Sequence, residues 1–189
     1  MTEESIREKI LIERMQAGDH KAVDEIFERY KGPLFGFIVR IIHDNDAAED
    51  VFQETFIKMV RYIGKFKGNS KFSTWLFQIA LNQCRDTLRK GKNKTFVPVE
   101  DYEESLSIEP AADPYRIMKS QRVRAIVDSL PDKMKETVVL RYFHDMNEHE
   151  IAGIVGCPEG TVKSRLFRAA GIIRKKWKLS EGYTMKEGC

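Results

Sequence analysis

Apolar residues recur at three- and four-residue intervals along most of the chain, which is the pattern of helices that bury one face. The first such pattern predicts a helix over residues 4–17 that Gly18 closes. Asp19 can cap the helix that follows, because its carboxylate can accept from free backbone N–H groups. Pro33 interrupts this second pattern, so a break or kink is expected near residues 31–33 before the pattern resumes.

Two longer helices are predicted after residue 44. Asp44 or Asn45 can cap the first of them. Its apolar stripe consists of Val51, Thr55, Met59 and Tyr62. A loop rich in glycine, asparagine and serine leads to the second helix. Phe72 and Trp75 on that helix are expected in the core, because aromatic residues at helical spacing are more often buried than exposed.

The helical pattern is lost over residues 92–113, which contain six acidic residues and no helical period. Such a segment is typical of an extended, flexible linker. Helices resume at Pro114 and again at Pro131. The pattern therefore predicts an all-α protein of two small helical domains, residues 1–91 and 114–178. A flexible acidic linker joins them, and a disordered tail is expected at residues 179–189.

The most distinctive pattern lies between residues 147 and 178, where a short helix, a glycine turn and a longer basic helix follow one another. Asn147 can cap the short helix, and Glu150 can reach back to it to complete a capping box. Gly156 supplies the positive φ that the turn needs, and Pro158 suits the first position of the next helix. This order is the signature of a helix-turn-helix.

The longer helix has one apolar face and one polar, cationic face. The apolar positions, expected to be buried, are Val162, Leu166, Ala169, Ala170, Ile173 and Trp177. The polar positions are Glu159, Thr161, Lys163, Ser164, Arg165 and Arg168. Seven basic residues and no acidic one lie between residues 163 and 178, which suits a polyanion. A charged helix can also be merely solvated, but the capped helix and turn before it favour DNA binding.

Composition adds a charge asymmetry to this picture. The 189 residues, 42% of them hydrophobic, are enough for one large or two small domains. The net charge of +3 is the sum of +1 over residues 1–91, −4 over residues 92–115 and +6 over residues 116–189. No apolar run is long enough to span a bilayer, and the first residues lack the pattern of a signal peptide. A cytoplasmic location is therefore expected.

The sequence indicates neither a catalytic site nor a metal site. Cys84, Cys157 and Cys189 are too scattered for a disulfide framework or a paired zinc motif, so reduced structural thiols are expected. The four histidines lie at unrelated positions, and neither a glycine-rich phosphate loop nor a nucleophile constellation is found. A binding protein without a cofactor is favoured over an enzyme.

Acidic and amide side chains crowd the start of the helix that follows residue 44. They are Asp46, Glu49, Asp50, Gln53 and Glu54. Carboxylates near a helix N-terminus interact favourably with the helix dipole, which is a purely structural explanation. A protein partner with basic helices would also explain an exposed acidic face. Both interpretations stay open on the residues alone.

Aromatic and basic residues lie together around the helix that contains Phe72. The basic ones are Lys71, Arg85, Arg89 and Lys90. Unpaired bases stack on aromatic faces while phosphates pair with cations, so this composition suits single-stranded nucleic acid. Since Phe72 and Trp75 are assigned to the core, the exposed candidates are the loop of residues 66–70, Asn82 and Arg85.

Taken together, these segments resemble the extracytoplasmic-function sigma factors, the two-domain initiation subunits of bacterial RNA polymerase. The resemblance covers nearly the whole chain. It rests on DAAEDVFQETF, FSTWLFQIALNQCRDTLR, LPDKMKETVVLRYF and IAGIVGCPEGTVKSRLFRA, in the family's order and spacing. Each segment alone is moderate support, whereas the ordered set is highly specific.

The resemblance implies a role for each group of residues. Docking on the clamp helices of the largest polymerase subunit is implied for Asp46, Glu49, Asp50, Gln53 and Glu54. Capture of a flipped base of the minus-ten promoter element is implied for the loop with Phe66, Lys67, Asn69, Ser70 and Lys71, beside Asn82, Arg85 and Arg89. Recognition of the minus-35 element is implied for Lys163, Ser164, Phe167 and Arg168, with Thr161 and Arg165 nearer to the phosphates.

The implied partners are the core polymerase, promoter DNA that is duplex at minus-35 and unpaired at minus-ten, and an anti-sigma factor. That factor could hold the protein at the membrane without direct insertion. Binding energy would stabilise strand separation without ATP. A dimeric helix-turn-helix regulator is the main alternative, but it leaves the acidic helix and the aromatic loop without a role. A nuclease or recombinase would need clustered carboxylates, whereas those at residues 46–54 scatter around a helix start.

Overall fold

Helices account for all regular secondary structure in residues 3–91 and 114–184, whose backbone the computed structural model describes. Side chains are described for residues 3–91 and 118–179. Within these ranges the predicted all-α class is confirmed. The chain divides into two units, residues 1–100 and 101–189. The predicted linker, residues 92–113, lies outside the described residues.

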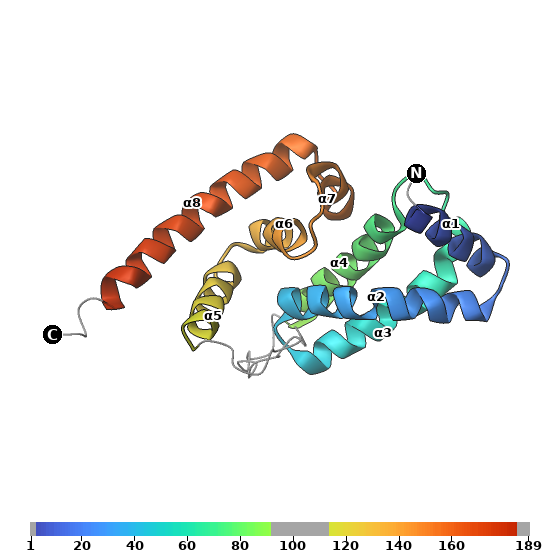
Figure 1. Cartoon of the computed structure of the whole chain (residues 1–189), viewed down its shortest axis with the longest axis horizontal. Helices are drawn as coiled ribbons and strands as arrows, with labels where there is room; N and C mark the ends of the chain where they lie inside the picture. The colour runs from blue at the N-terminus through green and yellow to red at the C-terminus, as the bar shows by residue number, and fades with distance from the viewer. Residues whose placement is uncertain (1–2, 92–113, 185–189) are drawn as a thin grey trace. The chain divides into compact units, whose positions relative to one another are not determined.

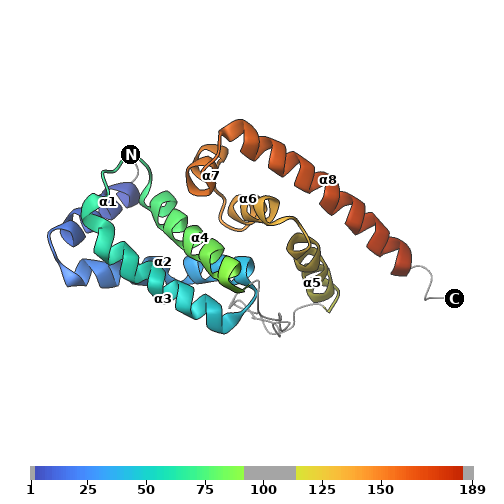
Figure 2. The ribbon, with the colours of Figure 1, turned by 180° about the vertical axis from the view of Figure 1, so that it is seen from behind.

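The first unit is a bundle of helices built on three long ones (Figure 1). Its elements are α1 (Glu3–Gln16), α2 (His20–Ile42), α3 (Asn45–Tyr62), η1 (Ile63–Lys65) and α4 (Phe72–Gly91). The helices α2, α3 and α4 pack against one another, while α1 packs on α2 and lies beside the 3-10 turn η1. Figure 2 shows α3 and α4 side by side from behind.

Short polar caps separate these helices, as the sequence predicts. Gly18 adopts a φ of 87° between α1 and α2, a conformation that favours glycine. Asp19 caps α2, because its Oδ1 accepts from the backbone N–H of Lys21 at 2.9 Å. Asp44 caps α3 by accepting from the N–H of Ala47 at 2.9 Å. Both predicted helix starts are confirmed.

Pro33 does not divide the second helix. The chain from His20 to Ile42 is one helix with Pro33 inside it. Of the predicted break or kink, the break is therefore wrong, and the kink stays a prediction. A proline in a helix interior costs roughly 3 kcal/mol because it removes one hydrogen bond and crowds the preceding turn. Here Pro33 is exposed, while Ile26 and Leu34 on either side of it are fully buried. Burial of each such side chain contributes about 1.5–3 kcal/mol, so packing outweighs the local cost.

The core of the first unit lies between α2, α3 and α4. Phe37 and Phe77 are buried, and their ring centroids lie 5.1 Å apart. Other large, fully enclosed side chains are Ile26, Leu34, Ile38, Ile41, Met59, Phe72, Leu76 and Leu81. Phe72 thus lies in the core as expected. Trp75 is only half-buried, so its predicted burial is wrong.

The second unit contains four helices within residues 114–184. They are α5 (Pro114–Asp128), α6 (Asp132–Tyr142), α7 (Glu148–Val155) and α8 (Glu159–Thr184). The long helix α8 contacts each of the other three. The core side chains are Ile126, Val127, Leu130, Val138, Val139, Leu140, Met146, Ile151, Ile154, Val155, Val162 and Ala169. Among the helices described in either unit, none has both the length and the apolarity to cross a membrane.

The last helix is longer than the sequence predicts. It continues to Thr184, so the expectation of a disordered tail is wrong for residues 179–184. Leu179 and Glu181 are good helix formers, and the helical Gly182 costs only about 1 kcal/mol. The remaining predicted tail, residues 185–189, lies outside the described residues.

Candidate nucleic-acid and polymerase interfaces

The helix-turn-helix of the second unit is defined by contacts close in sequence. Asn147 Oδ1 accepts from the N–H of Glu150 at 2.9 Å, and Glu150 Oε2 accepts from the N–H of Asn147 at 2.9 Å. These two bonds form the predicted capping box. Gly156 ends α7 with a φ of 74°, as predicted. The carbonyl of Pro158 accepts from the N–H of Thr161, so α8 begins at Glu159, one residue later than expected.

A contact that sequence analysis missed joins the starts of α7 and α8. His149 Nδ1 and Glu159 Oε1 lie 2.8 Å apart. The His149 side chain is 87% exposed, so the pair contributes little to stability. It places the side chain of Glu159, the first residue of α8, next to α7. His149 and Glu159 lie in different helices on either side of a turn, so helical spacing offers no signal for this contact.

One face of α8 presents four of the six predicted minus-35 residues to solvent. They are Lys163, Ser164, Phe167 and Arg168. Residues 163 and 164 lie about one helical turn before residues 167 and 168, so the four side chains share one face of the helix. Phe167 is 83% exposed, although burial of a phenylalanine is normally favourable. An exposed aromatic ring between cationic side chains is a feature of a binding surface rather than of a solvated helix.

The other two predicted residues, Thr161 and Arg165, are half-buried beside this face. Arg165 Nη1 is buried and has no hydrogen-bond partner among the described residues. Part of this guanidinium group therefore faces the protein. On the apolar side, only two of the six positions predicted to be buried, Val162 and Ala169, are fully buried. The predicted burial is wrong for the other four, because Ala170 is exposed and Leu166, Ile173 and Trp177 are half-buried. Ala170 lies one position, or about 100°, beyond the buried row of Ala169.

The acidic start of α3 is exposed at four of its five predicted positions. These are Asp46, Glu49, Asp50 and Gln53. The fifth, Glu54, is half-buried and its Oε1 lies 3.6 Å from Nζ of Lys58. Lys58 in turn donates to Oε1 of Gln83 on α4 at 2.7 Å. The charge of Glu54 is thus partly offset within the unit, which the acidic run alone could not reveal.

Two apolar side chains that sequence analysis overlooked extend the acidic face of α3. Ile57 is 50% exposed and Val60 is 44% exposed. They follow Asp50 and Gln53 at three- and four-residue spacing, so all four lie along one side of the helix. Exposed apolar residues beside a polar patch are typical of protein interfaces. The spacing from Gln53 to Ile57 and Val60 was the available sequence signal.

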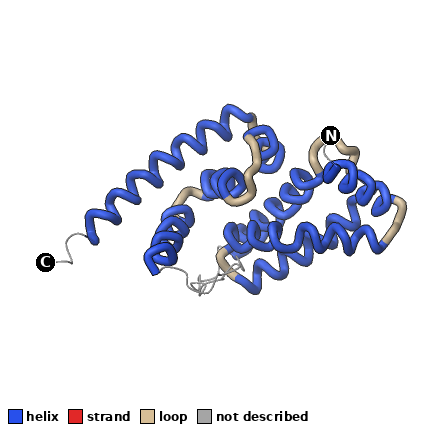
Figure 3. The backbone as a smooth tube through the Cα atoms, viewed as in Figure 1, coloured by secondary structure: helices blue, strands red, loops and turns tan. Residues whose placement is uncertain are grey.

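The loop of residues 66–71 connects η1 to α4 (Figure 3). It begins beside aromatic rings and ends in exposed polar residues. Phe66 is half-buried, with its ring centroid 5.3 Å from that of Trp75 and 5.7 Å from that of Phe72. The exposed residues are Lys67, Asn69, Ser70 and Lys71. Gly68 has a φ of 72°, which allows the tight bend at the tip. Trp75 is half-buried because it is shared between the core and this loop.

The three predicted minus-ten residues of α4 follow one stripe of the helix. Asn82 and Arg89 are exposed and Arg85 is half-buried. Arg89 pairs with the carboxylate of Asp86 one turn earlier. Asn82 lies seven positions after Trp75, so it is on nearly the same side of α4. The stripe from Trp75 to Arg89 rises about 21 Å, enough for a strand of several nucleotides.

Comparison with known proteins assigns both units. Residues 26–94 match the family model for sigma-70 region 2, and residues 120–170 match that for sigma-70 region 4. The RNA polymerase sigma-H factor of Pseudomonas aeruginosa is 37% identical over 175 residues, which cover 87% of this chain and 91% of that protein. The ECF RNA polymerase sigma-E factor of Salmonella typhimurium is 34% identical over 183 residues, which cover 92% of this chain and 95% of that protein.

A solved structure has the same fold. It is the sigma factor RpoE of Bartonella quintana in complex with the anti-sigma factor NepR, with a TM-score of 0.68 and 23% identity. The match covers 82% of this chain and 96% of that one. With relatives this similar over nearly their whole length, the chain belongs to the extracytoplasmic-function sigma factors of the sigma-70 family.

Proposed function

We propose that this sigma factor directs core RNA polymerase to promoters with two separate elements, and that it opens them by binding alone. The observation that carries the proposal is the exposed face of Lys163, Ser164, Phe167 and Arg168 on the second helix of a helix-turn-helix. In this proposal residues 114–178 form the minus-35 domain. Residues 1–91 form the minus-ten and polymerase-binding domain, and residues 92–113 link the two.

The minus-35 element is recognised in the major groove by α8. An arginine such as Arg168 can donate two parallel hydrogen bonds to guanine, and Lys163 can donate to guanine or to a phosphate. The ring of Phe167 can contact a thymine methyl group. Thr161 and Arg165 lie at the edge of this face and reach the phosphate backbone. Phosphate contacts then set the register, while base contacts set the promoter sequence.

The minus-ten element is bound as a single strand by the 66–71 loop and the stripe on α4. The exposed side chains of Lys67, Asn69, Ser70 and Lys71 surround an unpaired base, while Asn82, Arg85 and Arg89 follow the strand. Extruding a base costs a few kcal/mol of stacking and pairing energy, which contacts to the extruded base offset. Strand separation is then driven by binding energy, so neither ATP nor a catalytic group is required.

The polymerase is bound by the exposed face of α3. Asp46, Glu49, Asp50 and Gln53 supply negative and polar groups, with Glu54 at the edge of the patch. Ile57 and Val60 supply apolar area next to them. A polar rim around apolar side chains is the usual anatomy of a protein interface. Asp50→Lys should weaken core binding by roughly tenfold or more, because opposing like charges are costly. Asp24→Lys, an exposed acidic position on α2, is the matched control.

An anti-sigma factor is the proposed negative regulator. The support is the structural likeness to the Bartonella quintana sigma factor, which is bound to the anti-sigma factor NepR. Because promoter DNA and polymerase are the partners, the protein is proposed to act in the cytoplasm. A membrane-bound anti-sigma factor would hold it near the membrane through a protein contact.

Transcription in vitro tests the proposed function. Core polymerase is incubated with a fragmented genomic library, with and without the full chain, and the 5′ ends of the transcripts are sequenced. Discrete new start sites that share two spaced upstream motifs are expected. Specific duplex binding by the protein alone, without new transcripts, would instead favour the dimeric helix-turn-helix regulator.

A further inference from the structure

We propose that Gln16 is a positioning residue for promoter opening, because its side chain fixes the base of the 66–71 loop. It lies in α1, before the region matched to the sigma-70 region 2 model, which begins at residue 26. The inference rests on the proposed role of the loop in binding the unpaired minus-ten strand. It assigns to α1 a part in DNA melting although α1 itself need not touch DNA.

The contact consists of two hydrogen bonds from one amide group. Nε2 of Gln16 donates to the carbonyl oxygen of Phe66 at 2.8 Å and to that of Ile63 at 3.1 Å. A glutamine side chain has two N–H donors, so both bonds can form at once. The carbonyl of Ile63 also accepts from the N–H of Phe66 at 3.0 Å, which closes η1. Gln16 therefore holds both ends of the turn that leads into the loop.

Phe66 is held from its other side by aromatic rings. Its ring packs near Phe72 and Trp75, with centroid separations of 5.7 Å and 5.3 Å. The backbone carbonyl is bonded to Gln16 while the side chain is packed, so this residue has little freedom to move. The exposed tip begins directly after it, at Lys67. A loop whose base is already fixed loses less conformational entropy when it binds a ligand.

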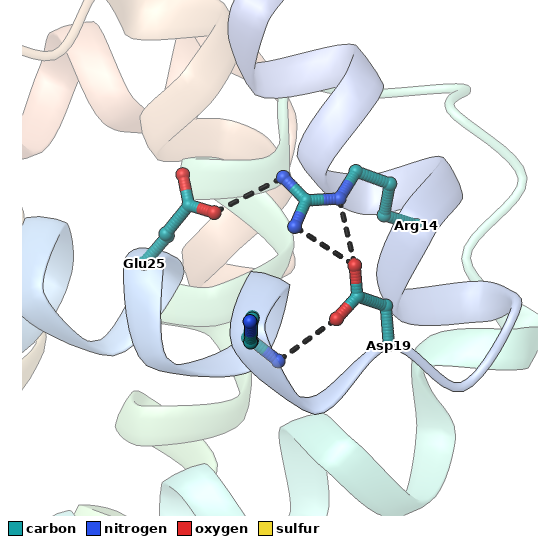
Figure 4. A network of polar contacts seen from close by, with 4 residues as sticks. Arg14, Asp19 and Glu25 are labelled. Carbon is teal, nitrogen blue, oxygen red and sulfur yellow. Dashed lines mark hydrogen bonds and ion pairs between the residues drawn. The ribbon is translucent and has the colours of Figure 1, made fainter.

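The helix that presents Gln16 is itself attached firmly to α2. Ile12 and Met15 of α1 are buried. Arg14 donates to Asp19 at 2.8 Å and to Glu25 at 3.0 Å (Figure 4). The hydrogen bond with Arg14 lowers the pKa of Asp19 from its ordinary value.

A second set of contacts attaches the first half of α1. Arg29 of α2 pairs with Glu4 at 3.0 Å. The hydroxyl of Tyr30 donates to the carboxylate of Glu8, and burial together with this bond raises the pKa of Tyr30. Figure 1 shows the loop between α3 and α4 beside α1. The loop, α1 and α2 thus form one connected polar framework.

Three full-chain variants separate positioning from general stability. Gln16→Met has nearly the same length as glutamine but no donor, and Gln16→Lys restores a donor that can reach a carbonyl oxygen. Glu13→Gln is the matched control, because Glu13 is exposed on α1 and its side chain pairs with Lys9 of the same helix. It also changes the charge by the same +1 as Gln16→Lys, so it controls for simple attraction to DNA.

The readouts are made with each variant bound to core polymerase on one promoter recognised by the wild type. They are duplex binding before melting, permanganate reactivity of the minus-ten thymines over time, and affinity for a single-stranded minus-ten oligonucleotide. Gln16→Met should slow opening and weaken oligonucleotide binding by roughly tenfold, with duplex binding before melting unchanged. Gln16→Lys should recover most of the loss, and Glu13→Gln should behave as wild type.

An additional variant at the loop tip, Asn69→Ala, distinguishes failure of this inference from failure of the proposed function. If Asn69→Ala slows opening but Gln16→Met does not, the positioning role of Gln16 is overturned and the role of the loop stands. If Gln16→Met and Gln16→Lys slow promoter opening equally and in proportion to a fall in Tm, Gln16 only stabilises the fold and its positioning role is overturned. If Asn69→Ala leaves opening unchanged, the role of the loop fails and the inference fails with it.

Discussion

The helix-turn-helix and the 66–71 loop are both proposed to bind promoter DNA, but they are held in shape in different ways. In the helix-turn-helix the defining contacts are local, since the capping box joins residues three positions apart. In the loop the defining contacts are distant, since Gln16 is 47 and 50 positions from the carbonyls that it binds. The first element is shaped by its own sequence, whereas the second depends on the packing of the whole unit around it.

This difference predicts how each element responds to damage. Loss of packing in the first unit should disorder the loop and impair the proposed binding of the minus-ten element. The helix-turn-helix should be unaffected, because its caps and its core lie within the second unit. Conversely, damage to the second core should leave the loop intact.

The largest expected effect comes from the two cores. Phe37→Ala should lower the free energy of unfolding of the first unit by about 3–5 kcal/mol, because it removes a buried ring packed on Phe77. Leu140→Ala should lower that of the second unit by about 2–5 kcal/mol. Amide hydrogen exchange of the full chain is the measurement. Loss of protection in both units from either substitution would contradict the independence of the two cores.

The next effect concerns base recognition by α8. Arg168→Ala should reduce discrimination between cognate and altered minus-35 sites by about 1–3 kcal/mol, if Arg168 contacts a base. Arg174→Ala, at an exposed position further along the same helix, should weaken binding to all sequences alike. Competition binding of the holoenzyme to site variants measures the difference. Equal loss of discrimination in both variants would remove Arg168 from the recognition residues.

A smaller effect tests the local character of the turn. Gly156→Ala should destabilise the second unit by about 1–2 kcal/mol, because an L-residue at a φ of 74° is strained. No atom lies within 4 Å of the added Cβ, so the cost is in the backbone. Gly160→Ala lies in helical backbone with equally open space, and should stabilise by about 0.5–1 kcal/mol. Urea unfolding of both variants measures the change in the free energy of unfolding. Changes of the same sign in Gly156→Ala and Gly160→Ala would refute this explanation of the turn.

The smallest effect is a pH dependence in the framework that supports the loop. The pKa of Asp19 is lowered by its hydrogen bond with Arg14, so ionised Asp19 stabilises the first unit above its ordinary pKa of about 4. This contribution is lost as the pH falls through the lowered pKa. Asn can still cap a helix, so Asp19→Asn removes mainly the charge. In thermal unfolding at pH 7, the Tm of the wild type should be higher than that of Asp19→Asn. This difference in Tm should disappear as the pH falls below about 4. A difference in Tm that does not change with pH would contradict a stabilising ion pair between Asp19 and Arg14.

Much of the fold could be predicted because the sequence signals for its helices lie within a few residues of one another. The capping residues Asp19, Asp44 and Asn147 each act within three residues of the helix they begin. The exposed face of α8 follows from helical spacing alone. Family resemblance suggested the roles that are proposed for these surfaces, which spacing cannot supply.

The features that could not be predicted depend on what packs against a residue. The break at Pro33 was a sound local expectation, but burial on both sides of it keeps α2 continuous. Glu54 belongs to an acidic run in the sequence, yet the nearby Lys58 offsets part of its charge. Lys58 also donates a hydrogen bond to Gln83 of α4. Gln16 and His149 carry no signal, because each finds its partner only after the chain has folded.

The division of the chain into two units also has an evolutionary consequence. Substitutions that weaken one unit need not be compensated in the other, so each can drift or duplicate under its own selection. Recombination within residues 92–113 could then pair an existing first unit, proposed to bind the minus-ten element and the polymerase, with a new second unit, proposed to bind the minus-35 element. A bacterium could acquire a new regulon in one genetic event, with the unit proposed to open the strands inherited unchanged.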